Sequence, residues 1–295
     1  MCGTCGCGSE ENGPKILSPT IGKEKHSHEH GEHHSHGHSH TLNHSHGHHH
    51  DHDHHHNGHH HHHHDHSHGH DHHQKTVLEV ERDILQQNEI MAARNRGYFD
   101  AKDIFALNLV SSPGSGKTSL LERTLKDLKD KIPFYVIEGD QQTLNDANRI
   151  SALDVPVIQI NTGKGCHLES DMVHEAVKKL NIENDSVLMI ENVGNLVCPS
   201  MFNLGEHKRV VIVSTTEGDD KPIKYPDMFH TSDICIINKI DLAPYLDTNI
   251  EELKRNALQV NPNLVFFEVS ATKGTGMELW YDWLEKNINL IPENQ

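Results

Sequence analysis

The sequence predicts an α/β fold with a mostly parallel, seven-stranded sheet and helices on both faces, preceded by a disordered N-terminal tail rich in Cys and His. Three observations support this prediction. Short apolar runs alternate with amphipathic stretches after residue 75. These runs are continuous, which is typical of parallel strands that are buried on both faces. Residues 26–73 hold 28 of the 32 histidines and almost nothing that could form a core.

A lead-in helix is predicted at the start of the folded domain, from Thr76 to a stop at Gly97. Its apolar residues recur at near-helical spacing: Val77, Val80, Ile84, Leu85, Ile90 and Met91. Seven strands are expected at residues 104–110, 134–140, 155–161, 186–192, 209–215, 233–239 and 264–270. Amphipathic helices are expected between them and after the last, at residues 118–130, 168–180, 250–258 and 276–287.

The chain therefore divides into three parts. Residues 1–8 form a tip with the pattern Cys-x-x-Cys-Gly-Cys. Residues 9–75 form a disordered linker that contains the His-rich tract at 26–73. Residues 76–295 form the folded domain, and ligands of such a domain are expected at the carboxyl ends of its parallel strands.

Charge and composition exclude several classes of partner. The formal net charge is −17 with His counted as neutral, against 26 Lys and Arg residues, which argues against binding to nucleic acid or to an anionic membrane. The sequence shows no charged-then-apolar leader and no run of roughly 20 apolar residues, so a cytoplasmic location is expected. In that reducing compartment the six cysteines are expected to be thiols, metal ligands or core residues.

The segment SSPGSGKT at Ser111–Thr118 lies between a predicted strand and a predicted helix, as a P-loop does. Gly114 and Gly116 would let backbone N–H groups surround phosphate. Lys117 would reach the β- and γ-phosphates, and the hydroxyl of Thr118 would contact magnesium. Ser111 departs from the usual pattern, which has Gly at that position. The sequence thus predicts a P-loop NTPase sheet.

Two further motifs select the base. Asp241 of NKID follows another strand, and its carboxylate can accept from both N1–H and the exocyclic amine of guanine, a donor pair that adenine lacks. The segment SAT at Ser270–Thr272 ends the last strand and matches the loop that contacts the guanine carbonyl in GTPases. GTP is therefore favoured over ATP. The predicted nucleotide-binding residues are Gly114, Ser115, Gly116, Lys117, Thr118, Ser119, Asn238, Lys239, Asp241, Ser270 and Ala271.

Two acidic positions are candidates for magnesium and the switch regions. Glu191 and Gly194 of IENVG take the place of the usual D-x-x-G, so Glu191 would hold the metal directly or through water. Asp140 of IEGDQQT is the candidate in the first switch, and a helix cap is the alternative for it. The predicted catalytic residues are Lys117, Thr118, Asp140 and Glu191, of which the last three are also the magnesium residues. Neither a Gln nor an Arg stands out as the residue that positions the hydrolytic water.

These motifs resemble the HypB family, SIMIBI-class P-loop GTPases that help to deliver nickel to nickel–iron hydrogenases. The resemblance covers nearly all of the chain outside the His-rich tract: CGTCGCG, NLVSSPGSGKT, VIEGDQQT, NTGKGCHL, IENVGNLVCP, TEGDDKPIKYP and NKIDL. The related urease GTPase UreG has a similar fold, but its pattern lacks the cysteine tip. The resemblance implies a magnesium-dependent GTPase that forms a homodimer around nucleotide and metal. It also implies two partners, the accessory protein HypA and the hydrogenase large-subunit precursor.

The resemblance implies two metal sites as well. At the tip, Cys2, Cys5 and Cys7 with the α-amine freed by removal of Met1 would form a three-sulfur, one-nitrogen set that suits square-planar Ni(II). The same thiolates would also accept tetrahedral zinc, and the resemblance is what favours nickel.

The second implied site consists of Cys166, His167 and Cys198, which leave one coordination position open or shared with a second chain. Cys235 lies inside an apolar run and is expected in the core. The His-rich tract offers many weak imidazole sites, which is typical of a nickel store, although it is also compatible with a solvated linker that binds metal incidentally.

The sequence as a whole predicts a GTP-hydrolysing nickel metallochaperone for hydrogenase maturation. Because Cys198 follows the switch glycine Gly194 closely, nucleotide state and metal binding are expected to be coupled. Lys221 and Lys224 are candidates for contacts across a dimer interface. The alternatives are a nickel or zinc storage protein whose nucleotide fold is regulatory, and a GTPase for another nickel enzyme such as urease.

Overall fold

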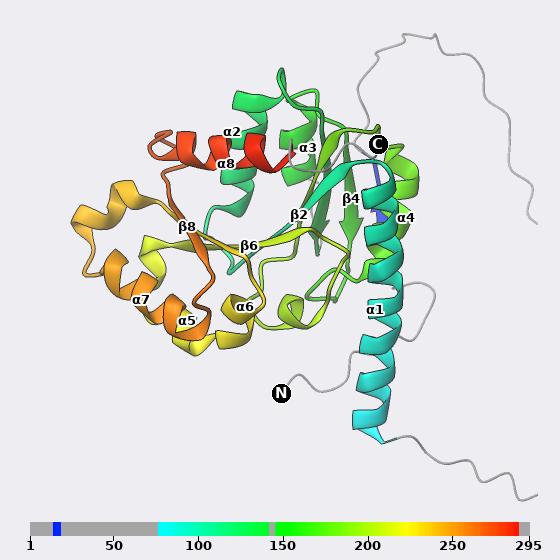
Figure 1. The fold of residues 1–295 in the computed structure, drawn as a ribbon, viewed down its shortest axis with the longest axis horizontal. Coiled ribbons are helices and arrows are strands. Elements are labelled where there is room, and N and C mark those ends of the chain that lie inside the picture. The colour runs from blue at the N-terminus through cyan, green and yellow to red at the C-terminus, as the bar shows by residue number, and fades with distance from the viewer. Residues whose placement is uncertain (1–13, 19–75, 142–144, 289–295) are drawn as a thin grey trace, which may run out of the picture. The chain divides into compact units, whose positions relative to one another are not determined.

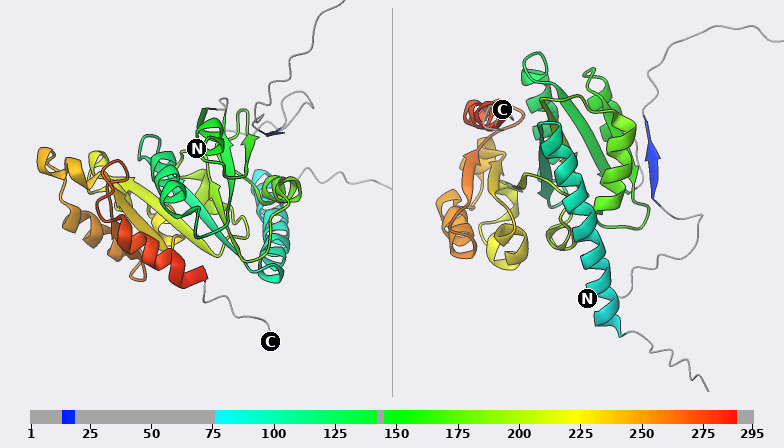
Figure 2. Two further views of the ribbon diagram at one scale, coloured as in Figure 1. Left: turned by 90° about the horizontal axis from the view of Figure 1, so that it is seen from above. Right: turned by 45° about the vertical axis from the view of Figure 1, so that its right-hand side comes forward.

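The computed structural model describes residues 14–18, 76–141 and 145–288. The predictions for the cysteine tip at 1–8 and for the His-rich tract at 26–73 lie outside the described residues. Figure 1 shows a central sheet with helices packed against it, and the two further views in Figure 2 show that helices cover both of its faces.

Among the described residues, eight strands form one sheet in the order β1-β4-β3-β5-β2-β6-β7-β8. All seven predicted strands are present and pair in parallel. They are β2 (Ile104–Ser111), β3 (Phe134–Asp140), β4 (Val157–Asn161), β5 (Ser186–Glu191), β6 (Lys208–Ser214), β7 (Ile234–Asn238) and β8 (Val265–Glu268). The α/β fold with a mostly parallel sheet is confirmed.

The eighth strand, β1 (Lys15–Leu17), was not predicted. It pairs antiparallel with β4, with Ile16 opposite Ile160, inside the segment that the sequence assigned to a disordered linker. Three residues are too few to show a periodicity. The free edge of β4 supplies backbone partners that are visible only once the sheet is formed.

One face of the sheet is covered by α2 (Lys117–Leu128), α3 (Asn145–Ser151) and α8 (Met277–Ile288). The largest apolar cluster lies here, between these helices and strand residues such as Leu107, Val136 and Ile236. Trp280 of α8 is 1% exposed, stacks on Trp283 and donates a hydrogen bond of 3.1 Å to Thr124 of α2. This contact fixes the P-loop helix α2 against the C-terminal helix.

The opposite face carries two helix pairs. One pair is α1 (Val77–Ala101) with α4 (Ser170–Leu180), and the other is α6 (Pro226–His230) with α7 (Ile250–Val260). Short helices complete the described fold: α5 (Lys221–Lys224), η2 (Cys198–Met201), η3 (Thr215–Glu217) and η4 (Ile240–Tyr245). Because the sheet is buried on both faces, its polar chemistry gathers at the ends of the strands.

Helix α1 begins at a capping box in which Thr76 and Glu79 satisfy each other's backbone N–H groups. The predicted stop at Gly97 is wrong, because the helix continues to Ala101. Phe99, which is fully buried, packs into the core two residues beyond the glycine. That burial outweighs the roughly 1 kcal/mol that Gly costs in a helix interior relative to Ala. The first turns of α1 extend beyond the sheet in Figure 1. None of the helices in the described ranges is long and apolar enough to cross a membrane.

The packing of α8 leads to a prediction about stability. Trp280→Ala should lower the free energy of unfolding by about 3–5 kcal/mol, because it removes a large buried side chain and leaves a cavity. Leu279→Ala is the matched control on the same helix, since Leu279 is 66% exposed and its truncation should change stability by about 0.5 kcal/mol or less. Urea denaturation followed by circular dichroism measures both. Equal losses in the two variants would contradict this packing.

Candidate nucleotide and metal sites

The P-loop follows β2 and ends at the first turn of α2. Gly114 and Gly116 have φ values of 80° and 89°, and a Cβ on Gly116 would lie 2.5 Å from Nδ2 of Asn238. Glycine is therefore required at residue 116 on both grounds. Ser111, where the usual pattern has Gly, is the last residue of β2 and keeps strand conformation, so the departure imposes no backbone strain here.

Lys117 and Thr118 converge on one buried carboxylate, that of Glu191 at the end of β5. Nζ of Lys117 lies 2.9 Å from Oε1 of Glu191, and the hydroxyl of Thr118 donates to the same oxygen at 2.6 Å. Glu191 is 2% exposed. A carboxylate so buried requires this cation and this donor, because an unpaired buried charge is very costly.

A second carboxyl group, Glu138, lies beside Glu191 on the neighbouring strand, where the two residues are register partners. Burial, and then the charges of Glu191 and Asp140, raise the pKa of Glu138 to about 9, with Lys117 opposing the shift. Without a cation beside it, Glu138 therefore favours its neutral form at neutral pH. Sequence reasoning missed this residue, because a Glu within an apolar strand carries no motif of its own.

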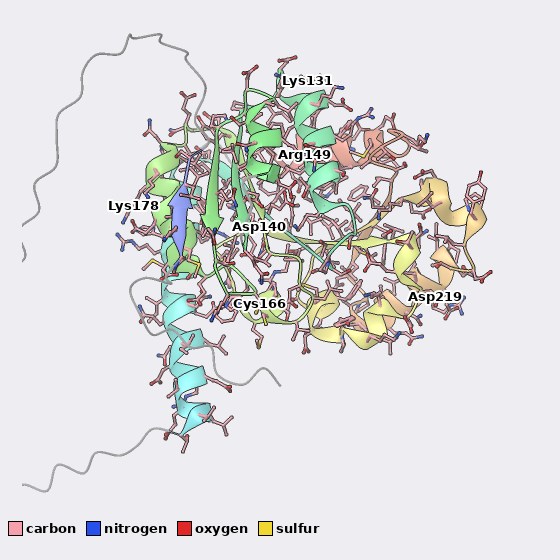
Figure 3. All side chains as sticks on the ribbon, turned by 180° about the vertical axis from the view of Figure 1, so that it is seen from behind. Lys131, Asp140, Arg149, Cys166, Lys178 and Asp219 are labelled. Carbon is pink, nitrogen blue, oxygen red and sulfur yellow. The ribbon has the colours of Figure 1, made fainter. Side chains whose placement is uncertain are left out.

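Two aspartates lie close to this centre. Asp140, the predicted switch residue, is the last residue of β3 and so lies at the carboxyl end of the sheet. Figure 3 labels it together with Cys166 of the loop after β4. Asp146, in the first turn of α3, has Oδ2 at 3.3 Å from the hydroxyl of Thr118. Asp146 was not predicted, because its place beside the P-loop depends on how α3 packs on α2.

The residues of this centre fit a divalent cation. Oε2 of Glu191 and Oε2 of Glu138 are buried without a hydrogen-bond partner among the residues that the structure describes. Carboxylate and hydroxyl oxygens are the ligands that Mg²⁺ prefers. Thr118, Asp140 and Glu191, the residues predicted for magnesium, lie at the ends of adjacent elements here.

The predicted base-recognition residues come together at the ends of β7 and β8. The side chain of Asn238 donates to the carbonyl of Ser115 in the P-loop at 3.0 Å and accepts from the backbone N–H of Ala271. Lys239 donates to the carbonyl of Gly114 at 2.6 Å. Asn238 thus ties the P-loop to the SAT segment.

Asp241 accepts a hydrogen bond of 2.6 Å from the hydroxyl of Ser270. This contact orients one carboxylate oxygen, as bidentate recognition of a base requires. Of the remaining predicted nucleotide residues, Ser119 lies in the first turn of α2.

Glu217 was also missed by sequence reasoning. It lies in η3 after β6, and its carboxylate accepts from the hydroxyls of Ser112 and Ser115, from the latter at 2.6 Å. Lys221, a candidate for a contact across a dimer, lies 3.4 Å from the same carboxylate. Glu217 therefore anchors the P-loop hydroxyls to β6. Lys224, the other candidate, pairs with Asp220.

A second cluster brings Cys166, His167 and Cys198 together. One potential ligand atom from each of the three residues lies within 4.8 Å of the others. Cys166 and His167 belong to the loop after β4, and Cys198 begins η2. Two thiol sulfurs and one imidazole nitrogen are ligands that suit zinc or nickel and leave a coordination position open.

The imidazole of His167 is held by packing. Its ring stacks on Phe202 with centroids 3.9 Å apart, and its Nε2 is buried without a hydrogen-bond partner in the described ranges. Glu169 Oε1 is 3.5 Å from this nitrogen.

The other cysteines lie apart from this cluster or outside the described residues. Cys235 is fully buried in the core, as predicted, and burial raises the pKa of its thiol. Cys2, Cys5 and Cys7 lie outside the described residues.

The nucleotide and thiol centres are joined by the segment after β5. A Cβ on Gly194 would lie 3.3 Å from the Cα of Pro113, so this switch glycine packs directly on the P-loop. One residue further, the side chain of Asn195 donates to the carbonyl of Cys166 at 3.3 Å. The same short segment therefore touches both centres and leads into Cys198.

Comparison with known proteins agrees with this geometry. Residues 105–268 match the family described as "CobW/HypB/UreG, nucleotide-binding domain". A hydrogenase maturation factor HypB from Rhizobium leguminosarum bv. viciae is 58% identical over 212 residues, which cover 72% of this chain and 71% of the relative.

Two solved structures are similar in sequence and fold. HypB from Archaeoglobus fulgidus is 37% identical with a TM-score of 0.65, and the match covers 69% of this chain and 99% of that one. HypB from Helicobacter pylori in complex with nickel is 39% identical with a TM-score of 0.66, covering 69% of this chain and 95% of that one. Sequence, fold and motifs agree, and the chain belongs to the HypB family of nucleotide-binding P-loop proteins.

Proposed function

We propose that this protein is a magnesium-dependent GTPase that binds, stores and delivers nickel for the maturation of nickel–iron hydrogenase. The observation that carries the proposal is the segment Gly194–Cys198, which packs on the P-loop at one end and supplies a thiol to the Cys166/His167 cluster at the other. A relative named as a hydrogenase maturation factor and another solved in complex with nickel support the same conclusion.

GTP would act first on the pair formed by Lys117 and Glu191. The β- and γ-phosphates draw the Lys117 ammonium toward them, because their charge exceeds that of one carboxylate. Glu191 and Thr118 are then available to a magnesium ion together with Asp140. A magnesium ion held there supplies positive charge where negative charge develops on the phosphates. Asp241, Asn238 and the SAT segment select guanine.

Nickel is the cargo in this proposal. Cys166, His167 and Cys198 form an inner site whose open position accepts an incoming ligand, and zinc would bind the same donors. Because Cys198 lies on the switch segment, GTP binding and hydrolysis alter the affinity of this site. The cysteine tip supplies a tight site and the His-rich tract a store.

Partners follow from this arrangement. A homodimer whose formation depends on nucleotide and metal would complete the inner coordination shell with donors from two chains. The accessory protein HypA and the hydrogenase large-subunit precursor are the proposed protein partners. The rival function is nickel or zinc storage with a regulatory nucleotide fold. GTP turnover after deletion of residues 26–73 separates the two functions.

Lys117→Ala is predicted to lower kcat/KM for GTP hydrolysis by at least about 10²-fold, because a preorganised charge at the phosphates is lost. Lys126→Ala is the control, since Lys126 lies on the same helix but is exposed near its C-terminal end. Phosphate release measures both. An unchanged rate in Lys117→Ala would disprove the role of the P-loop.

Asp241→Asn is predicted to weaken GTP binding by roughly 10²-fold, because hydrogen bonds to a charged group contribute about 1.5–3 kcal/mol each. Xanthosine triphosphate should bind this variant better than the unmodified protein, since its base presents an acceptor where guanine presents an amine. Asp247→Asn removes a charge from the exposed segment that follows η4 and serves as the control. Unchanged affinities for both nucleotides in Asp241→Asn would contradict the base assignment.

Deletion of residues 26–73 is predicted to lower the number of nickel ions bound per chain several-fold and to leave GTP turnover unchanged. The Archaeoglobus fulgidus protein, 99% of which is covered by this chain's match, shows that the fold exists with little beyond the domain. Equilibrium dialysis with metal analysis measures the stoichiometry. Equal stoichiometry with and without the tract would remove the storage role, and turnover lost with the tract would favour the rival function.

A further inference from the structure

Asn192 follows Glu191 directly, and its side chain begins two branches of hydrogen bonds, one to the loop that carries Cys166 and His167 and one toward helix η2. It is 0% exposed. Its Oδ1 accepts hydrogen bonds from the backbone N–H of Leu168 at 3.1 Å and of Val193 at 2.9 Å. Leu168 is the residue after His167. One amide oxygen therefore holds the loop that carries Cys166 and His167.

The amide nitrogen of Asn192 starts a second branch. It donates to Oδ1 of Asn108 at 3.3 Å, and Nδ2 of Asn108 donates to Oε1 of Glu206 at 3.1 Å. Glu206 forms a buried ion pair of 2.8 Å with Arg209. The branch thus passes from β5 through β2 to β6.

Arg209 carries this branch to the other metal-ligand segment. Its guanidinium donates to the carbonyl of Ser200 at 3.1 Å and to that of Phe202 at 2.9 Å. Ser200 belongs to η2, the helix that begins at Cys198. Phe202 is the ring on which His167 stacks. Both segments that supply ligands are therefore hydrogen-bonded to one continuous buried network.

We propose that Asn192 is the positioning residue through which nucleotide state changes the affinity of the Cys166/His167/Cys198 site, an inference that rests on the proposed function. When phosphate draws Lys117 from Glu191, the end of β5 loses its ion pair with that ammonium group, and the neighbouring Asn192 moves with the backbone. Its bonds to Leu168 and Asn108 pass that movement to the two ligand segments. A buried, fully hydrogen-bonded network transmits such changes because no water replaces a broken bond at low cost.

The test uses the full-length protein and reads the inner site alone. Alkylation rates of Cys166 and Cys198 are followed by peptide mass spectrometry at fixed free Ni(II) concentrations, with saturating GDP or a non-hydrolysable GTP analogue. The nickel concentration that gives half-maximal protection is determined in each nucleotide state. The ratio of the two concentrations measures the coupling, and metal bound elsewhere in the chain does not enter it.

The unmodified protein should show a ratio of at least about fivefold, the lower end of typical coupling between sites. In Asn192→Ala the ratio should fall to within about twofold of unity, below the range of typical coupling between sites, while both thiols are still protected by nickel. Cys198→Ala is included to show that protection of Cys166 requires the inner site.

Asn261→Ala is the matched control for the loss of a buried amide. Asn261 donates to the carbonyls of Phe229, His230 and Ser232, so its loss leaves every hydrogen bond between Asn192 and Glu206 in place. Its ratio should equal that of the unmodified protein. Asn108→Ala, which keeps the bond to Leu168 and breaks the branch to Glu206, should give a reduced ratio and decides the question if Asn192→Ala does not fold.

The outcomes separate the inference from the function on which it rests. A ratio of unity in the unmodified protein would overturn the proposed coupling of GTP and metal, whatever Asn192 does. A ratio that differs from unity and survives in Asn192→Ala and Asn108→Ala would overturn the role of Asn192 and leave the proposed function standing. A ratio that is lost in these variants and retained in Asn261→Ala would establish Asn192 as the positioning residue.

Discussion

The structure depends on one constraint, the burial of the Glu191 carboxylate at the end of β5. A charge that is 2% exposed is stable only with partners, and it takes them from the P-loop, the ammonium of Lys117 and the hydroxyl of Thr118. The first turn of α2 and the end of β5 are consequently locked together. Whatever changes the partners of Glu191 changes the position of one relative to the other. The segment that follows Glu191 leads within a few residues to Gly194 and Cys198.

The parallel sheet determines why so much chemistry meets at this place. Strands covered by helices on both faces carry mainly apolar side chains along their length, so most of the polar side chains that can meet a ligand lie in the loops at their carboxyl ends. The ends of β2, β5, β6 and β7 surround the P-loop, with Asn238 and Glu217 as its lateral supports. The loop after β4 and helix η2, which follows β5 in the chain, present sulfur and imidazole instead. Two chemistries thus share one edge of the sheet, with Asn192 between them.

The sequence predicted the parts of this architecture that depend on local pattern. Continuous apolar runs identified the seven parallel strands. The motifs at residues 111–118 and 238–241 located two loops that the structure brings into contact through Asn238 and Ser115. The sequence could not predict Asp146, Glu138, Glu217 or the Asn192 network, whose roles arise from packing between elements distant in the chain. The predicted helix end at Gly97 was wrong because the burial of Phe99 outweighs the low helix propensity of glycine. β1 was not predicted because its three residues form a strand only by pairing with β4.

The placement of the two ligand sets explains how one protein could both hold and release a metal. The nucleotide residues lie at strand ends and at the start of α2, where the sheet fixes them. The thiols and the imidazole lie on a loop and on a four-residue helix, held to the sheet by side-chain hydrogen bonds instead of by the ladder. Such bonds can rearrange one at a time, whereas a change of strand register would break the whole ladder and turn every side chain to the other face. The coupling proposed between the sites is reciprocal by thermodynamic necessity, so a metal that closes the ligand loops would also stabilise the arrangement of Glu191 that accompanies GTP. Metal loading and nucleotide state would therefore each report on the other, and cargo would be released when hydrolysis removes the γ-phosphate that favours the closed arrangement.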